Sequence, residues 1–196
     1  MVLNPNNPYF RQVQLLVRVL PTVAEHPVFA LKGGTAINLF VRDLPRLSVD
    51  IDLAYEPVKP RAESLADIHL NLDQIAQKLT KQGLSIQKNQ QQETTRLTVS
   101  NGQAQIKIET SPVLRGTVHP TRQMTVTPKV ESLFGYVETT VLSFEDLYAG
   151  KLCAALDRQH PRDLYGKALT LHIWPKVSKS KLASIPVRST KASSIE

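Results

Sequence analysis

The chain has 196 residues, which is enough for one α/β domain with a buried core. Its 41% hydrophobic and 21% charged residues are ordinary for a soluble globular protein, and no apolar run approaches the roughly 18 residues that span a bilayer. A single cysteine excludes an internal disulfide framework and favours a reducing cytoplasm, while the net charge of +7 favours anionic partners such as nucleotide or RNA.

Hydrophobic periodicity predicts alternating helices and strands in the first half of the chain. The predicted helices cover residues 9–25, 35–42 and 63–82, and the predicted strands cover 28–31 and 47–55. The third helix is the clearest, because apolar residues recur along one face: Leu65, Ile68, Leu72, Ile75 and Leu79. Gly83 follows as a C-terminal cap.

The second half begins with strand-like segments and ends in helices. The predicted strands cover residues 84–87, 95–100, 104–110, 124–127 and 137–141. The pair Asn101-Gly102 predicts a two-residue hairpin turn. Ser143 is expected to cap a helix over 144–157, and Pro161 opens a helical segment over 162–171.

Two aspartates stand in the strand predicted over 47–55. Side chains alternate between the faces of a strand, so Asp50 and Asp52 share one face and the apolar residues share the other. Two carboxylates roughly 7 Å apart repel each other, and a divalent cation such as Mg²⁺ removes that cost. The alternative, which the pattern alone favours, is an edge strand with two solvated acids.

A glycine pair precedes the helix predicted over 35–42. Gly33 and Gly34 let backbone N–H groups approach a phosphate without a Cβ in the way. Thr35 adds a hydroxyl donor or a helix N-cap, and Lys32 adds a cation. The alternative is a tight turn with a capping threonine. A P-loop is excluded, because no GK[ST] follows at the required spacing.

A third acid lies on a later predicted strand. Polar and apolar residues alternate over 105–109, which places Glu109 on the same face as Lys107. If this strand neighbours the strand of Asp50 and Asp52, Glu109 reaches the same site as a third metal ligand. The alternative is a solvated hairpin face.

Together, the segments LKGGTAINLF, RLSVDIDLAY and IKIET resemble the minimal pattern of the polymerase-β-like nucleotidyltransferase superfamily, which is a glycine turn, a DxD strand and a third acid. With FEDLYAGKLCAALDRQHPRDLY, they resemble more narrowly the AbiEii/AbiGii nucleotidyltransferase toxin family of abortive-infection toxin–antitoxin pairs. The resemblance implies an α+β nucleotidyltransferase fold, in which a small mixed sheet is flanked by helices. We therefore expect three parts: a nucleotidyltransferase-like domain over 1–142, a shortened helical C-terminal part over 143–174 and, from a Ser-, Lys- and Thr-rich composition without a clear period, a disordered basic tail over 175–196.

The resemblance also implies roles for the site residues. Asp50 and Asp52 would bind Mg²⁺ or Mn²⁺, with Glu109 as the third metal ligand. Lys151 would contact the nucleotide phosphates, and Asp163 would act near the attacking hydroxyl as a base. The residues expected to hold an NTP are Lys32, Gly33, Gly34, Thr35, Arg46, Ser48 and Lys151.

The activity implied is metal-dependent transfer of a nucleoside monophosphate from an NTP to a hydroxyl, with the 3′ end of tRNA or another RNA as acceptor. The protein would be a toxin of a type IV-like system in phage defence, with a cognate antitoxin and no membrane partner. One alternative keeps the chemistry and makes a protein hydroxyl or a small molecule the acceptor. Another rests on Gly166, which stands where the family has a second acid after Tyr165. In this second alternative, the protein is a catalytically impaired, C-terminally truncated homologue that only binds nucleic acid or antitoxin.

Overall fold

A computed structural model of the protein describes residues 7–45, 47–88 and 95–158. Two compact units divide the chain, Met1–Gly150 and Lys151–Glu196. The helices are α1 (Pro8–Ala24), α2 (Gly33–Ala36), the π-helical segment η1 (Ile37–Val41), α3 (Arg61–Lys81), α4 (Pro128–Phe134) and α5 (Phe144–Arg158). The strands are β1 (Phe29–Lys32), β2 (Asp50–Tyr55), β3 (Ser85–Lys88), β4 (Arg96–Ser100), β5 (Gln105–Arg115), β6 (Arg122–Thr125) and β7 (Glu138–Val141).

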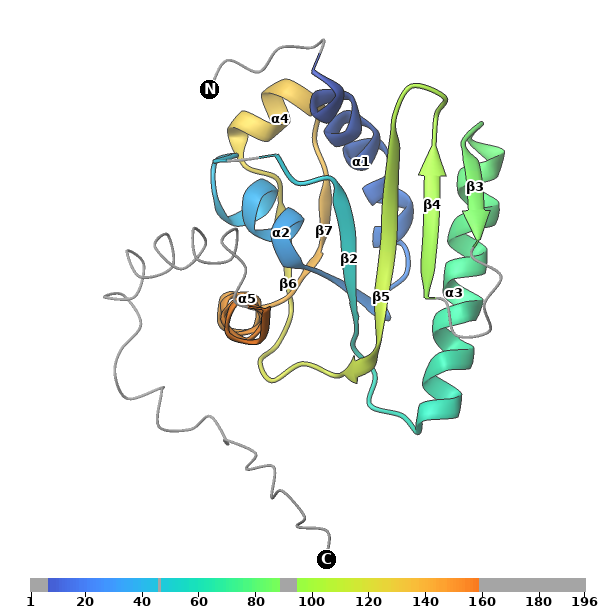
Figure 1. Cartoon of the computed structure of the whole chain (residues 1–196), viewed down its shortest axis with the longest axis vertical. Helices are drawn as coiled ribbons and strands as arrows, with labels where there is room; N and C mark the ends of the chain where they lie inside the picture. Colours follow the sequence, from blue (N-terminus) through green and yellow to red (C-terminus); the bar gives the residue numbers. More distant parts are fainter. Residues whose placement is uncertain (1–6, 46, 89–94, 159–196) are drawn as a thin grey trace, which may run out of the picture. The chain divides into compact units, whose positions relative to one another are not determined.

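The first unit is built on one mixed sheet (Figure 1). Its seven strands follow the order β3-β4-β5-β2-β1-β7-β6. The β2–β5 and β1–β7 pairs are parallel and the other pairs are antiparallel. The predicted mixed sheet with flanking helices is therefore confirmed. β2 lies inside the sheet, with β1 on one side and β5 on the other.

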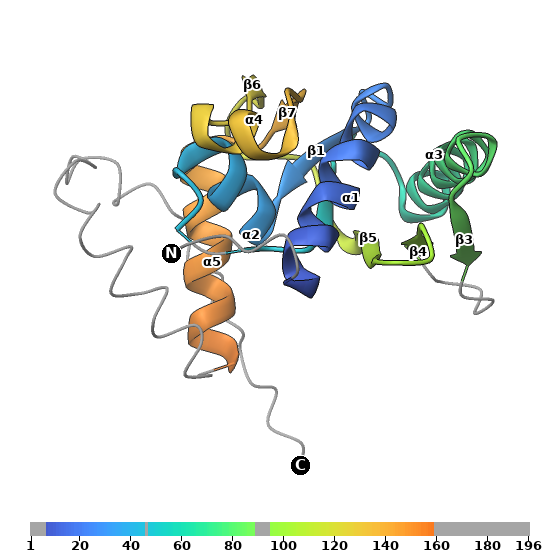
Figure 2. The same ribbon diagram turned by 90° about the horizontal axis from the view of Figure 1, so that it is seen from above.

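Helices α1 and α3 lie on the same side of the sheet (Figure 2). The apolar stripe of α3 is buried there as predicted, with Ile75 and Leu79 fully covered and only Leu65 half-exposed. The sheet contributes the alternate residues of its inner strands to the same core, namely Ile51, Leu53, Leu97, Val99, Ile106 and Ile108. Burial of these side chains on one face leaves the opposite face of β2, β5 and β4 to polar residues. Within the described ranges, no helix has the length and apolarity to cross a bilayer.

Two predicted helix caps are confirmed. The Ser143 hydroxyl accepts a hydrogen bond from the Asp146 N–H at 3.1 Å, which fixes the start of α5. Gly83 has a φ of +82° and donates its N–H to Thr80 O, while Leu84 donates to Leu79 O. That arrangement ends α3 with a glycine in the left-handed conformation.

Two local predictions were wrong in position by one or two residues, and one helix was missed. The helix predicted from Thr35 begins two residues earlier, at Gly33, and continues as η1. The hairpin turn has Gly102 and Gln103 at its tip, because Asn101 and Ala104 close it through the Asn101 N–H and the Ala104 carbonyl. The short helix α4 was not predicted at all, although a proline at its first position suits a helix start. The helix predicted over 162–171 and the tail over 175–196 lie outside the described residues.

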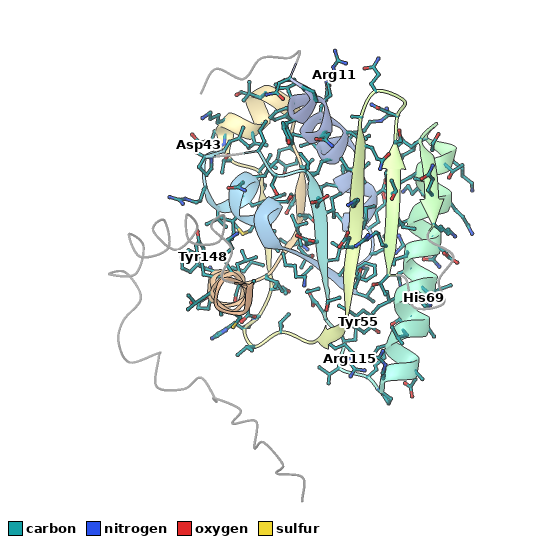
Figure 3. All side chains as sticks on the ribbon, viewed as in Figure 1. Arg11, Asp43, Tyr55, His69, Arg115 and Tyr148 are labelled. Atoms are coloured by element: carbon teal, nitrogen blue, oxygen red, sulfur yellow. The ribbon has the colours of Figure 1, made fainter. Side chains whose placement is uncertain are left out.

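A polar network fixes the end of β2 opposite the two aspartates. The buried Tyr55 donates its hydroxyl to Asp67 Oδ2 at 2.5 Å, and Lys59 Nζ reaches the same oxygen at 2.8 Å. The hydrogen bonds from Lys59 and then Tyr55 lower the pKa of Asp67. Burial and the bond to Asp67 raise the pKa of Tyr55. Figure 3 shows Tyr55 near Arg115, its register partner on β5. β2 is therefore anchored to α3 at this end.

Candidate active site

The glycine turn between β1 and α2 holds the backbone very close to β2. Gly33 has a φ of +74°, a conformation that side chains rarely adopt. A Cβ at Gly33 would lie 2.4 Å from Asp52 Oδ2 and 3.1 Å from Asp52 Cγ. The carboxylate of Asp52 therefore lies directly against the glycine turn, and only glycine fits beneath it.

The two aspartates lie on one face of β2, as the alternation predicts. Ile51 and Leu53 are 0% and 1% exposed on the core side. Asp50 is exposed and Asp52 is half-buried on the opposite side. The apolar face thus holds the strand in the core while the acidic face is presented to solvent.

Strand β5 brings the third acid beside the second aspartate. Asp52 and Glu109 are register partners on the parallel β2–β5 pair, and Asp50 is the partner of Lys107. Neighbouring strands are about 4.8 Å apart, so these side chains are direct neighbours on the acidic face. Glu109 Oε1 is bound by Arg96 Nε of β4 at 2.7 Å. Glu109 is therefore close to Asp52, and an arginine holds its carboxylate.

The donor set fits a hard divalent cation. Asp50 and Asp52 supply carboxylate oxygens beside a glycine turn, and Mg²⁺ is bound through one or two carboxylates together with substrate phosphates. Among the residues that the structure describes, no three His, Cys, Asp or Glu side chains are already grouped around a metal position. A metal held here would accordingly take its remaining ligands from a substrate, from water, or from Glu109 after release by Arg96.

Thr35 occupies a position different from the one expected. It is 0% exposed and lies within α2, whose N-cap is Lys32, so its prediction as the helix N-cap was wrong. Its hydroxyl donates to the Asp50 carbonyl oxygen at 2.5 Å and lies 3.0 Å from Ser48 Oγ. In this structure Thr35 and Ser48 therefore connect the glycine turn to the first residue of β2. Their predicted contact with phosphate remains a prediction.

The other predicted residues differ in how well they are placed. Lys32 is half-buried and is the register partner of Asp52 on β1, so it flanks the acid on the side opposite Glu109. Lys151 lies on α5, where the second unit begins, and its contact with nucleotide phosphates remains a prediction. Arg46 and Asp163 lie outside the described residues.

Two further residues, Lys107 on β5 and Asn38 in η1, have no role assigned from the sequence. Lys107 was noted only for sharing a face with Glu109, and its position beside Asp50 depends on a strand pairing that local sequence does not specify. Asn38 lies in η1, is 3% exposed, and its amide nitrogen has no hydrogen-bond partner among the described residues. π-Helical turns are frequent at functional sites, so this irregular segment is a signal that sequence patterns do not carry.

Known proteins resemble both the sequence and the fold. The family model described as "Nucleotidyl transferase AbiEii toxin, Type IV TA system" matches residues 14–165. Among solved structures, the nucleotidyltransferase toxin MenT4 from Mycobacterium tuberculosis H37Rv has a similar fold, with a TM-score of 0.51 and 13% sequence identity. The match covers 74% of this chain and 52% of that toxin, so the chain spans about half of its length. No curated protein matches the chain.

Proposed function

The chain belongs to the AbiEii nucleotidyltransferase toxin family, and from that premise we propose that it transfers a nucleoside monophosphate from an NTP to an acceptor hydroxyl. The reaction would depend on Mg²⁺ or Mn²⁺, and the leading acceptor is RNA, above all the 3′ end of tRNA. The protein would act in the cytoplasm as a phage-defence toxin controlled by a cognate antitoxin.

The observation that carries this proposal is the contact between the glycine turn and the second aspartate. A Cβ at Gly33 would lie 2.4 Å from Asp52 Oδ2. A turn whose backbone N–H groups can receive phosphate thus adjoins carboxylates that can bind a cation. A triphosphate needs both groups at one place, because its charge is spread over the reacting phosphorus and the leaving pyrophosphate.

Each residue contributes by position and charge. The acceptor oxygen would bond to the α-phosphorus, the bond to the bridging oxygen would break, and pyrophosphate would leave. The hydroxyl proton would pass to a base, for which Asp163 is the candidate. A divalent cation held by Asp50 and Asp52 would supply charge stabilisation at the phosphates. Lys32, next to Asp52 on β1, and Lys151 would add positive charge for the phosphates.

The test is incubation with labelled NTPs, Mg²⁺ and total tRNA, followed by separation of RNA from protein. We expect labelled RNA with the natural protein and at least a hundredfold less with Asp50→Asn, which keeps the side-chain volume and removes the charge. Labelled protein in place of labelled RNA would show a protein acceptor. RNA binding without any labelled product would instead support a catalytically impaired binding module.

A further inference from the structure

A row of polar side chains crosses the sheet from the first aspartate to the edge. Successive register partners place Asp50 beside Lys107 on β5, Lys107 beside Thr98 on β4, and Thr98 beside Gln87 on β3. At about 4.8 Å per strand, the row extends about 14 Å from Asp50. We call the polar face the surface formed by Gln87, Arg96, Thr98, Ser100, Gln105 and Lys107, which lie on β3, β4 and β5 (Figure 1).

The polar face lies on the opposite side of the sheet from the buried residues Leu97, Val99, Ile106 and Ile108. Helices α1 and α3 cover the other side (Figure 2). Over residues 85–88, 96–100 and 105–109, no large hydrophobic side chain is exposed. Protein partners are usually anchored by buried aromatic and apolar side chains, so this surface is poorly suited to a protein. Hydroxyl, amide and cationic groups suit a phosphodiester backbone.

The sheet order determines from which side the acceptor must approach. β2 lies between β1, which leads into the glycine turn, and β5, which carries Lys107. In phosphoryl transfer the attacking and leaving oxygens are roughly in line, on opposite sides of the phosphorus. If the leaving pyrophosphate lies at Gly33, the attacking hydroxyl arrives over β5.

The charges along that approach favour an anionic strand. Lys107 is exposed and is the register partner of Asp50. Arg96 lies one strand further out, on β4, and its Nε is 2.7 Å from Glu109 Oε1. Among the described residues of β3, β4 and β5, Glu109 is the only acid, and Arg96 offsets its charge. A guanidinium has five N–H donors, so an arginine bound through Nε still has donors for phosphate.

We propose that the polar face binds the backbone of the acceptor RNA, with Lys107 contacting a phosphate close to the reacting hydroxyl. This rests on the proposed function, because the approach is defined by in-line attack. Lys107 is thus a substrate-binding residue for the acceptor and has no part in binding the NTP.

The test compares Lys107→Gln with Lys81→Gln. Lys81 is also an exposed lysine, but it lies at the end of α3, on the other side of the sheet, so both variants lose one positive charge. Affinity for fluorescently labelled total tRNA is measured between 50 and 200 mM salt. Loss of one phosphate contact lowers the log–log salt slope by about 0.7 to 0.9, which is roughly a threefold smaller loss of affinity over that range.

We expect the smaller slope and a higher KM for tRNA only in Lys107→Gln, with the KM for NTP unchanged. Thr98→Lys, which adds a cation next to Lys107, should have the opposite effect on the slope. Equal slopes and equal KM values in Lys107→Gln and Lys81→Gln would overturn the proposal, as would labelled protein in place of labelled RNA. If the natural protein transfers no nucleotide, the proposed function fails, and the salt slope alone then decides whether this surface binds RNA.

Discussion

Substitution of Gly33 by alanine has two expected effects, which are backbone strain and displacement of the Asp52 carboxylate. Alanine at a φ of +74° costs about 1–2 kcal/mol, because its Cβ approaches the following carbonyl. The new Cβ would also lie 2.4 Å from Asp52 Oδ2, whereas ordinary contact begins at 3.4 Å, so the carboxylate must move by the difference, about 1.0 Å. A displacement of about 1 Å in a catalytic group can cost about 10²-fold in rate.

Gly83→Ala is the matched control. Gly83 has a φ of +82° at the end of α3, and a Cβ added there would have nothing within 4 Å. Urea unfolding should show a loss of about 1–2 kcal/mol in Gly83→Ala and at least as large a loss in Gly33→Ala, where the clash with Asp52 is added. Nucleotide transfer should fall about 10²-fold in Gly33→Ala and stay at the natural level in Gly83→Ala. Equal transfer rates in the two variants would refute the contact between the turn and Asp52 as a requirement for activity.

Further expectations concern the anchoring of β2. Thr35→Val removes a buried hydroxyl that binds the Asp50 carbonyl and should cost about 1–3 kcal/mol in urea unfolding, with Thr35→Ser retaining transfer; a fully stable valine variant would contradict this. Because the pKa of Asp67 is lowered in the folded state, its ionised carboxylate stabilises the fold above pH 3.8. This stabilisation is lost as the pH falls through the folded-state pKa. Asp67→Asn should therefore flatten the acid side of a plot of unfolding free energy against pH. Because the pKa of Tyr55 is raised in the folded state, its neutral hydroxyl stabilises the fold below pH 10.0. Tyr55→Phe should therefore flatten the plot of unfolding free energy above pH 10.0. An unchanged pH dependence in both variants would argue against the network with Lys59.

Local patterns predicted the parts of the fold that depend on neighbours in sequence. Alternation along residues 47–55 correctly placed Asp50 and Asp52 on one face, because Ile51 and Leu53 are buried on the other. Gly83 was readable as a helix cap because the left-handed conformation it adopts favours glycine. These signals reside in a few adjacent residues and need no knowledge of the tertiary structure.

The remaining features depend on contacts between distant segments. The Thr35 hydroxyl donates a hydrogen bond to the Asp50 carbonyl, fifteen positions away in the chain. The sequence shows that the hydroxyl is present but does not show which group accepts its hydrogen bond. The pairing of Glu109 with Asp52 follows from the parallel register of β2 and β5, and its contact with Arg96 follows from the antiparallel register of β4 and β5. Hydrophobic alternation specifies which face a residue takes, and not which strand lies beside it.

The most direct test of the account is the Mg²⁺-dependent rate of nucleotide transfer in Asp52→Asn. Asparagine preserves the side-chain shape against Gly33 and removes the charge that a cation requires. The account predicts that the natural protein labels RNA with Mg²⁺ and loses this activity with a chelator, and that Asp52→Asn folds normally but is at least a hundredfold slower. Transfer by Asp52→Asn at the natural rate would contradict it.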